Sequence, residues 1–107
     1  MISVGGRRFL PTGRVEHRIA KTEVVELLHL GESPPAKVEA ITENVSSQGA
    51  RVIADSVCAP GKAVRLNAPE EHLKLSARVV YCQRLDERKF AIGLQLEARV
   101  EEWQKLP

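Results

Sequence analysis

Short stretches in which every second residue is apolar recur along this chain, and this pattern restricts its fold more than any other feature. Residues 73–79 and 90–97 show it most clearly. The apolar members of these two stretches are Leu73, Leu75, Ala77, Val79, Phe90, Ile92, Leu94 and Leu96. Successive side chains of a β-strand point to opposite faces, so an apolar period of two predicts strands with one buried face. Residues 50–55 and 62–68 repeat the alternation, and residues 37–42 form a further β-compatible run.

Turn-forming residues separate these stretches. Two consecutive prolines at 34–35 interrupt helix and sheet hydrogen bonding, just after a Val- and Leu-rich run that stops at Gly31. Residues 59–61, Ala-Pro-Gly, predict a turn, and residues 86–88, Asp-Glu-Arg, predict a hairpin connection. Many short strands joined by such turns are typical of an all-β barrel or sandwich.

Both ends of the chain differ from the strands between them. We expect residues 1–13 to form a flexible arm and residues 14–107 to form a single domain, as the length of 107 residues favours. Residues 1–21 contain five basic residues and one acidic residue, a net charge of +4, which leaves −2 on the remainder. This asymmetry predicts an anion site near the N-terminus, or else only a solvated arm. Residues 100–106 predict a short amphipathic helix with Val100, Trp103 and Leu106 on one side.

Signatures of enzymes, metal sites and membrane segments are absent from the sequence. The three histidines, His17, His29 and His72, lack ligand spacing, so we expect no metal and no cofactor. There is no nucleophile elbow, P-loop or dinucleotide-binding glycine motif, so we expect no catalysis. Cys58 and Cys82 are widely separated and suit reduced thiols in a cytoplasm. No apolar run reaches the ~20 residues of a membrane span, and residues 1–13 hold no signal-peptide core.

Two arginines at positions 14 and 18 form an R-x-x-x-R motif. On a helix this spacing puts both guanidinium groups on one face, and in an extended segment it puts them on one side, about 13 Å apart. A guanidinium group can hold a phosphate with two hydrogen bonds, stack on a purine or bind a guanine edge. Taken alone, the pair is more typical of an ordinary solvent-exposed surface than of a ligand site.

Residues 44–49 form an N-x-S-x-x-G motif between two predicted strands. Asn44 and Ser46 favour a turn because their side chains bond to nearby backbone groups, and Gly49 permits a positive φ or a close backbone approach. The motif therefore predicts a hairpin turn. Alternatively, Asn44 and Ser46 present polar groups to the edge of a base such as guanine, which carries both donors and acceptors.

The order and spacing of the two motifs, followed by the remaining strands, resemble the PilZ domain family, whose signature is R-x-x-x-R followed by [D/N]-x-S-x-x-G. The resemblance covers residues 14–98. Residues 46–52 and 60–66 look like the family's turn-and-strand segments, and residues 77–81 and 90–96 look like its last two long strands. It implies a six-stranded antiparallel β-barrel, usually with a helix after the last strand.

The resemblance also implies a ligand, cyclic di-GMP, in which two phosphodiesters close two guanosines into a ring. Arg14 and Arg18 would contact its phosphates and guanine faces, while Asn44, Ser46 and Gly49 would line the barrel surface beneath a guanine. The chain would then be a bacterial receptor domain in second-messenger signalling, acting on a downstream protein. Because Gly13 rather than an arginine precedes the first motif, the number of bound ligands stays open.

Two alternatives remain at this stage. A PilZ-like barrel can act without nucleotide as a protein-interaction module, for example in pilus or motility machinery, although degenerate members usually lose the arginines. A small barrel that binds a nucleic-acid polymer is a third possibility. The four aromatic residues, Phe9, Tyr81, Phe90 and Trp103, offer few stacking platforms for single strands, so we expect no nucleic-acid polymer as partner.

Overall fold

The computed structural model describes residues 18–31, 36–98 and 100 of the chain. The predicted flexible arm at residues 1–13, Arg14 and most of the predicted C-terminal helix lie outside these residues. Within them, no α-helix occurs, and a single 3₁₀ turn, η1 (Pro69–Glu71), is present. None of the helical structure in this part of the chain is long and apolar enough to span a membrane.

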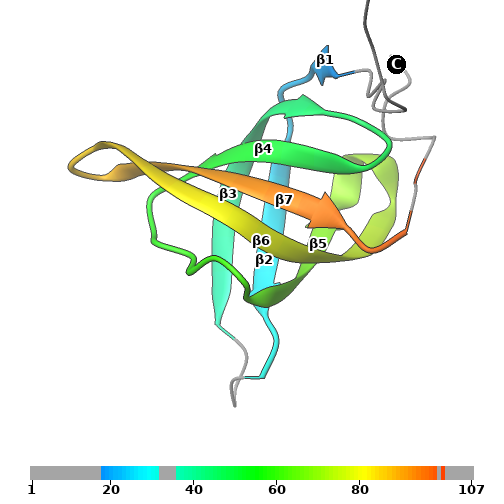
Figure 1. Ribbon diagram of the computed structural model, residues 1–107. Coiled ribbons are helices and arrows are strands. Elements are labelled where there is room, and N and C mark those ends of the chain that lie inside the picture. The colour runs from blue at the N-terminus through cyan, green and yellow to red at the C-terminus, as the bar shows by residue number, and fades with distance from the viewer. Residues whose placement is uncertain (1–17, 32–35, 99, 101–107) are drawn as a thin grey trace, which may run out of the picture.

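The strands form a closed antiparallel barrel (Figure 1). Their bounds are β1 (Ile19–Ala20), β2 (Val24–His29), β3 (Lys37–Val45), β4 (Gly49–Ala54), β5 (Ala63–Ala68), β6 (Leu73–Asp86) and β7 (Lys89–Leu96). The order around the barrel is β3-β2-β5-β6-β7-β4, and pairing of β4 with β3 closes it. The two-residue strand β1 adds to the end of β3 outside this ring. The predicted all-β fold and the six-stranded antiparallel barrel are confirmed.

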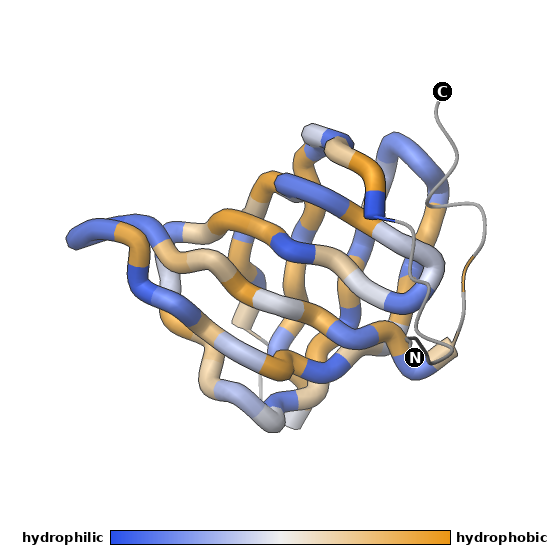
Figure 2. Tube along the Cα trace, turned by 45° about the horizontal axis from the view of Figure 1, so that its top comes forward, coloured by the Kyte–Doolittle hydropathy of each residue, from blue (hydrophilic) through white to orange (hydrophobic). Residues whose placement is uncertain are grey.

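The barrel interior is filled by the apolar residues of the alternating stretches. Leu27, Leu66 and Ile92 are the largest side chains that are fully buried, and each contributes about 1.5–3 kcal/mol of burial free energy. Figure 2 shows hydrophobic and hydrophilic residues alternating along the strands. In β6, Ala77 and Val79 are buried while the intervening positions are exposed, as the period of two predicts. In β7 the alternation is incomplete, because Ala91 is also fully buried.

The predicted turns are present at Gly31, Gly61 and the β6–β7 hairpin. Gly31 and Gly61 both have a φ of 90°, a conformation that L-residues rarely adopt. The hairpin turns directly after Asp86, which pairs with Lys89. Strands β6 and β7 extend beyond the barrel wall at this end, and their hairpin projects from the body in Figure 1.

Both cysteines are free thiols, as expected from their separation. Cys58 is fully buried, and its Sγ lies 3.5 Å from Nε2 of His29. Burial raises the pKa of Cys58 to about 11, so the group is a neutral thiol near neutral pH. In the described ranges, no group of three or more His, Cys, Asp or Glu side chains is placed to hold a metal ion.

Candidate functional site

Arg18, the last residue of the arginine motif, is followed directly by β1, which runs along the strand that leads into the polar turn. Strand β1 pairs with the end of β3, where Ile19 lies opposite Val45 and Ala20 lies opposite Asn44. The guanidinium Nη1 of Arg18 donates a hydrogen bond to Oδ1 of Asn44 at 2.5 Å. The second arginine of the first motif therefore contacts the first residue of the second motif, although 26 positions separate them.

Lys21 and Glu23, in the link between β1 and β2, make polar contacts that hold the chain after Arg18 against the barrel. The hydroxyl Oγ1 of Thr42 accepts a hydrogen bond from the Glu23 amide at 2.9 Å and donates one to the Lys21 carbonyl at 2.5 Å. The ammonium group of Lys21 forms a salt bridge of 2.6 Å with Glu71 of η1, and only 9% of the lysine side chain is exposed. Largely buried pairs of this kind hold a defined geometry better than surface pairs do. Arg18 thus leaves the barrel at a defined position beside Asn44.

The turn after β3 is built around Ser46. Its side chain is fully buried, and Oγ accepts hydrogen bonds from the amides of Gln48 and Gly49, both at 3.1 Å. The Ser46 amide donates to the Gly49 carbonyl at 2.8 Å. The hydroxyl therefore stabilises the turn itself, as serine side chains often do. The predicted contact between Ser46 and a guanine edge stays a prediction.

Gly49 is required by a close approach between strands β4 and β7. A Cβ atom at this position would lie 2.3 Å from the carbonyl oxygen of Leu94, which belongs to the backbone. Its φ is not in the positive range. The sequence allowed either a positive φ or a close backbone approach at Gly49, and the structure shows the close approach.

The segment after β7 supports the turn from its other side. The Leu96 amide donates to the Gln48 carbonyl and the Val100 amide donates to the Ser47 carbonyl, both at 2.8 Å. Ser47 is buried, whereas Gln48 is exposed and Asn44 is half-buried. Asn44 is therefore the turn-motif side chain best placed to meet a ligand beside Arg18.

A row of residues crosses the outer wall of the barrel from Asn44. Successive Cα partners are Ala20, Asn44, Arg51, Gly93 and Tyr81, on strands β1, β3, β4, β7 and β6. We call this set the polar row. Its register brings Arg18, which hydrogen-bonds to Asn44, onto the same wall as Arg51 and Tyr81. Residues far apart in sequence thus form one continuous surface.

Arg51 and Tyr81 form the centre of the polar row. The Arg51 guanidinium carbon lies 5.9 Å from the centroid of the Tyr81 ring, and Nη1 donates to the Tyr81 hydroxyl at 3.1 Å. Arg51 also forms a salt bridge with Glu43. Hydrogen bonds to Tyr81 and to Glu43 raise the pKa of Arg51 above its usual value. The guanidinium group is a permanent cation, as arginines in proteins are. The ring covers Gly93, where a Cβ atom would lie 2.1 Å from it.

The family model of the PilZ domain matches residues 12–106, a range that contains both motifs and every strand. This chain belongs to the PilZ domain family. A search of curated proteins found no match. PilZ domains are a cyclic di-GMP-binding family and are in general binding modules rather than enzymes.

The PilZ domain brings together four of the five residues predicted for its site. Arg18, Asn44, Ser46 and Gly49 lie at one end of the barrel wall, while Arg14 lies outside the described residues. Sequence reasoning missed Arg51 and Tyr81, which appeared only as members of predicted strands. Their contact depends on the register of β4, β7 and β6, which no local spacing reveals.

Replacing Ser46 by alanine in this PilZ domain is expected to lower the free energy of unfolding by about 1–3 kcal/mol, because the partly buried Gln48 amide and the buried Gly49 amide lose their shared acceptor. Urea denaturation measures the change. Ser56→Ala is the matched control, since the Ser56 hydroxyl donates to the carboxylate of exposed Asp55 and its loss should change stability by less than about 0.5 kcal/mol. Equal losses in the two variants would contradict a structural role for Ser46.

Proposed function

We propose that this PilZ domain is a receptor for cyclic di-GMP in bacterial second-messenger signalling. The observation that carries the proposal is the hydrogen bond between Arg18 and Asn44, which joins the two ligand motifs on one wall. Arg14 and Arg18 contact the ligand phosphates and guanine faces, and the N-x-S-x-x-G turn lies beneath a guanine. Arg14 is included in the proposed site on the basis of the R-x-x-x-R motif alone.

The chemistry of the polar row suits this ligand. Cyclic di-GMP carries two phosphodiester charges, and Arg18 and Arg51 supply cations on the same wall. Charge-assisted hydrogen bonds from arginine to phosphate are about twice as strong as neutral ones. The Asn44 amide offers a donor and an acceptor, which match a guanine edge. The ring of Tyr81, 38% exposed, adds an aromatic surface next to Arg51.

The proposal assigns no catalysis, metal or cofactor to the domain. Ligand binding at the polar row changes a surface that a downstream protein reads. We place the receptor in the cytoplasm, where the free thiols Cys58 and Cys82 remain reduced. It is not proposed to insert into a membrane or to bind a nucleic-acid polymer.

A calorimetric titration tests the proposal directly. The purified chain is titrated with cyclic di-GMP and, separately, with GTP and with the linear dinucleotide pGpG. We expect saturable binding of the cyclic ligand, with an affinity that falls as salt is added because phosphate contacts are screened. The stoichiometry from the same titration distinguishes one bound ligand from a stacked pair. Absence of binding, or equal affinity for GTP, would contradict the proposal.

A further inference from the structure

An apolar row crosses the outer face of the barrel next to the polar row. Val24, Ile41 and Ile53 are successive Cα partners on β2, β3 and β4. Val24 and Ile41 are each 48% exposed. The solvent face of an antiparallel sheet normally carries polar side chains. Three aligned β-branched residues at such positions indicate a surface that is covered in the functional state.

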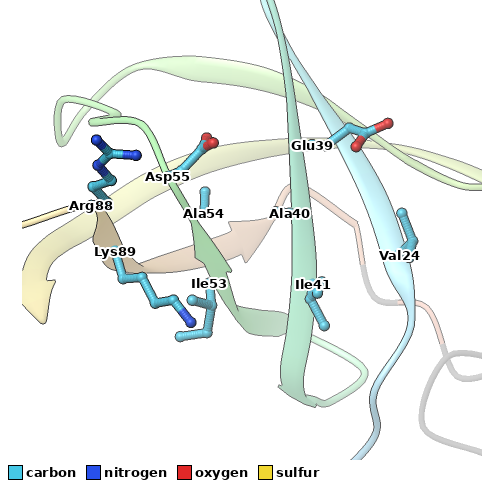
Figure 3. Close-up of a pocket in the computed structure, with 9 residues that line it drawn as sticks. All are labelled: Val24, Glu39, Ala40, Ile41, Ile53, Ala54, Asp55, Arg88 and Lys89. Carbon is cyan, nitrogen blue, oxygen red and sulfur yellow. The ribbon is translucent and has the colours of Figure 1, made fainter. Parts of the chain in front are cut away.

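This row forms part of a groove with a volume of about 410 Å³. Lys89 and Arg88 of the β6–β7 hairpin line it on one side, and the carboxylates of Glu39 and Asp55 also line it (Figure 3). In Figure 3 the Lys89 side chain extends toward Ile53, while Glu39 lies on the opposite side of the groove, beside β3. Within the described ranges, neither Glu39 nor Lys89 takes part in a salt bridge. The groove is therefore apolar, with unpaired charges of both signs at its border.

We propose that this groove is the interface through which two copies of this chain form a symmetric dimer. A two-fold interface uses the same patch on both subunits, so that patch must be complementary to itself. An apolar row bordered by a carboxylate on one side and an ammonium group on the other meets this condition. A two-fold axis through the row sets Lys89 of each copy against Glu39 of the other.

Two further exposed apolar side chains lie close in sequence to residues that line the groove. Val57, 63% exposed, follows Asp55 by two residues in the same loop. Leu85, 46% exposed, lies in the projecting hairpin that carries Lys89. Because nine residues line the groove, fewer than the roughly 20–30 residues that a stable interface uses on each side, the dimer is reversible and weak.

Sedimentation equilibrium over a range of protein concentrations tests the dimer. We expect a reversible monomer–dimer equilibrium for the native chain. Ile41→Glu should raise the dissociation constant by more than about 100-fold, because the charge enters the apolar row twice in each dimer. Val80→Glu is the matched control: Val80 is also 48% exposed but lies on β6 outside the groove, so the equilibrium should not change.

A charge exchange identifies the occupant as a second copy. Lys89→Glu and Glu39→Lys should each weaken self-association by about tenfold or more, since like charges then face one another. Mixing the two variants should restore dimers, because both cross-pairs in the mixed dimer are attractive. A partner other than this chain would leave the mixture monomeric.

Three results would overturn the proposal: a monomer at the highest attainable concentration, an equal effect of Val80→Glu, or no restoration on mixing. Circular dichroism melting shows whether each variant remains folded, and the mixing arm does not depend on the Ile41 variant. The dimer does not rest on nucleotide binding. Arg18→Ala should dimerise like the native chain, so failure of the ligand proposal would leave this result intact.

Discussion

Replacing Arg18 by alanine is expected to weaken the affinity for cyclic di-GMP by about 100-fold, while the fold is retained. The variant removes a cation and a two-pronged donor from the proposed phosphate contact, a loss of about 3 kcal/mol. Arg18 is exposed, and its hydrogen bond to Asn44 lies at the surface, where substitutions usually change stability little. We therefore expect the melting temperature to stay close to that of the native domain. Calorimetry and thermal melting measure the two quantities.

Two further variants show whether geometry or charge causes the loss. Arg18→Lys keeps the charge but not the planar fork, so its affinity should lie between those of the native and alanine forms. Arg65→Ala removes another exposed arginine, on β5. Strand β5 pairs with β2 and β6 and contributes no residue to the polar row. The affinity of this variant should equal that of the native domain. If Arg65→Ala weakened binding as much as Arg18→Ala, the effect would be a matter of overall charge and the proposed contact would be wrong.

Most strands could be predicted from the sequence because their determinants are local, whereas the six-stranded barrel was expected only from the resemblance to the PilZ domain family. An apolar period of two marks β4, β5, β7 and the first half of β6, and glycine marks the turns at Gly31 and Gly61. The turn after β3 could also be predicted, because the Ser46 hydroxyl bonds to amides only two and three residues away. Such signals are contained in short windows of sequence, where spacing alone is informative.

The surfaces of the barrel could not be predicted in the same way, because they depend on register. Arg51 and Tyr81 are 30 residues apart in the sequence. They contact each other only because both are Cα partners of Gly93, one on each side of β7. The apolar row is hidden for a similar reason: Ile53 alternates with the buried residues Val52 and Ala54, and only strand register aligns it with Ile41 and Val24. A shift of one residue in strand pairing would move each of these side chains to the other face.

Gly49→Ala is expected to have the largest effect on stability of any substitution in the turn motif. The added Cβ would lie 2.3 Å from the Leu94 carbonyl oxygen, and backbone atoms on both strands would have to separate. We expect the free energy of unfolding to fall by about 3 kcal/mol or more, as overpacked interiors do at the upper end of their range. Urea denaturation measures this loss. A change below about 1 kcal/mol would show that the strands adjust easily, against this expectation.

Gly93→Ala provides the contrast, because its obstacle is a side chain. The new Cβ would lie 2.1 Å from the Tyr81 ring, which can rotate away from Arg51 at the surface. We expect a smaller loss of stability, about 1–2 kcal/mol, and weaker nucleotide binding because the polar row is disturbed. In the double variant Tyr81→Ala/Gly93→Ala the clash is absent, so the two stability losses should not add. If the stability losses of the two single variants added in the double variant, the requirement for glycine at position 93 would come from the backbone and not from the Tyr81 ring.

The contrast between Gly49 and Gly93 shows which losses of cyclic di-GMP affinity come from unfolding and which come from a changed ligand surface. A Gly49 variant that fails to bind cyclic di-GMP has lost the pairing of β4 with β7 on which the turn rests, so its defect reports folding rather than a ligand contact. Gly93 variants that remain folded report on the polar row itself. Binding should therefore be measured at a temperature where each variant is shown to be folded, and only the loss that persists there is assigned to the site.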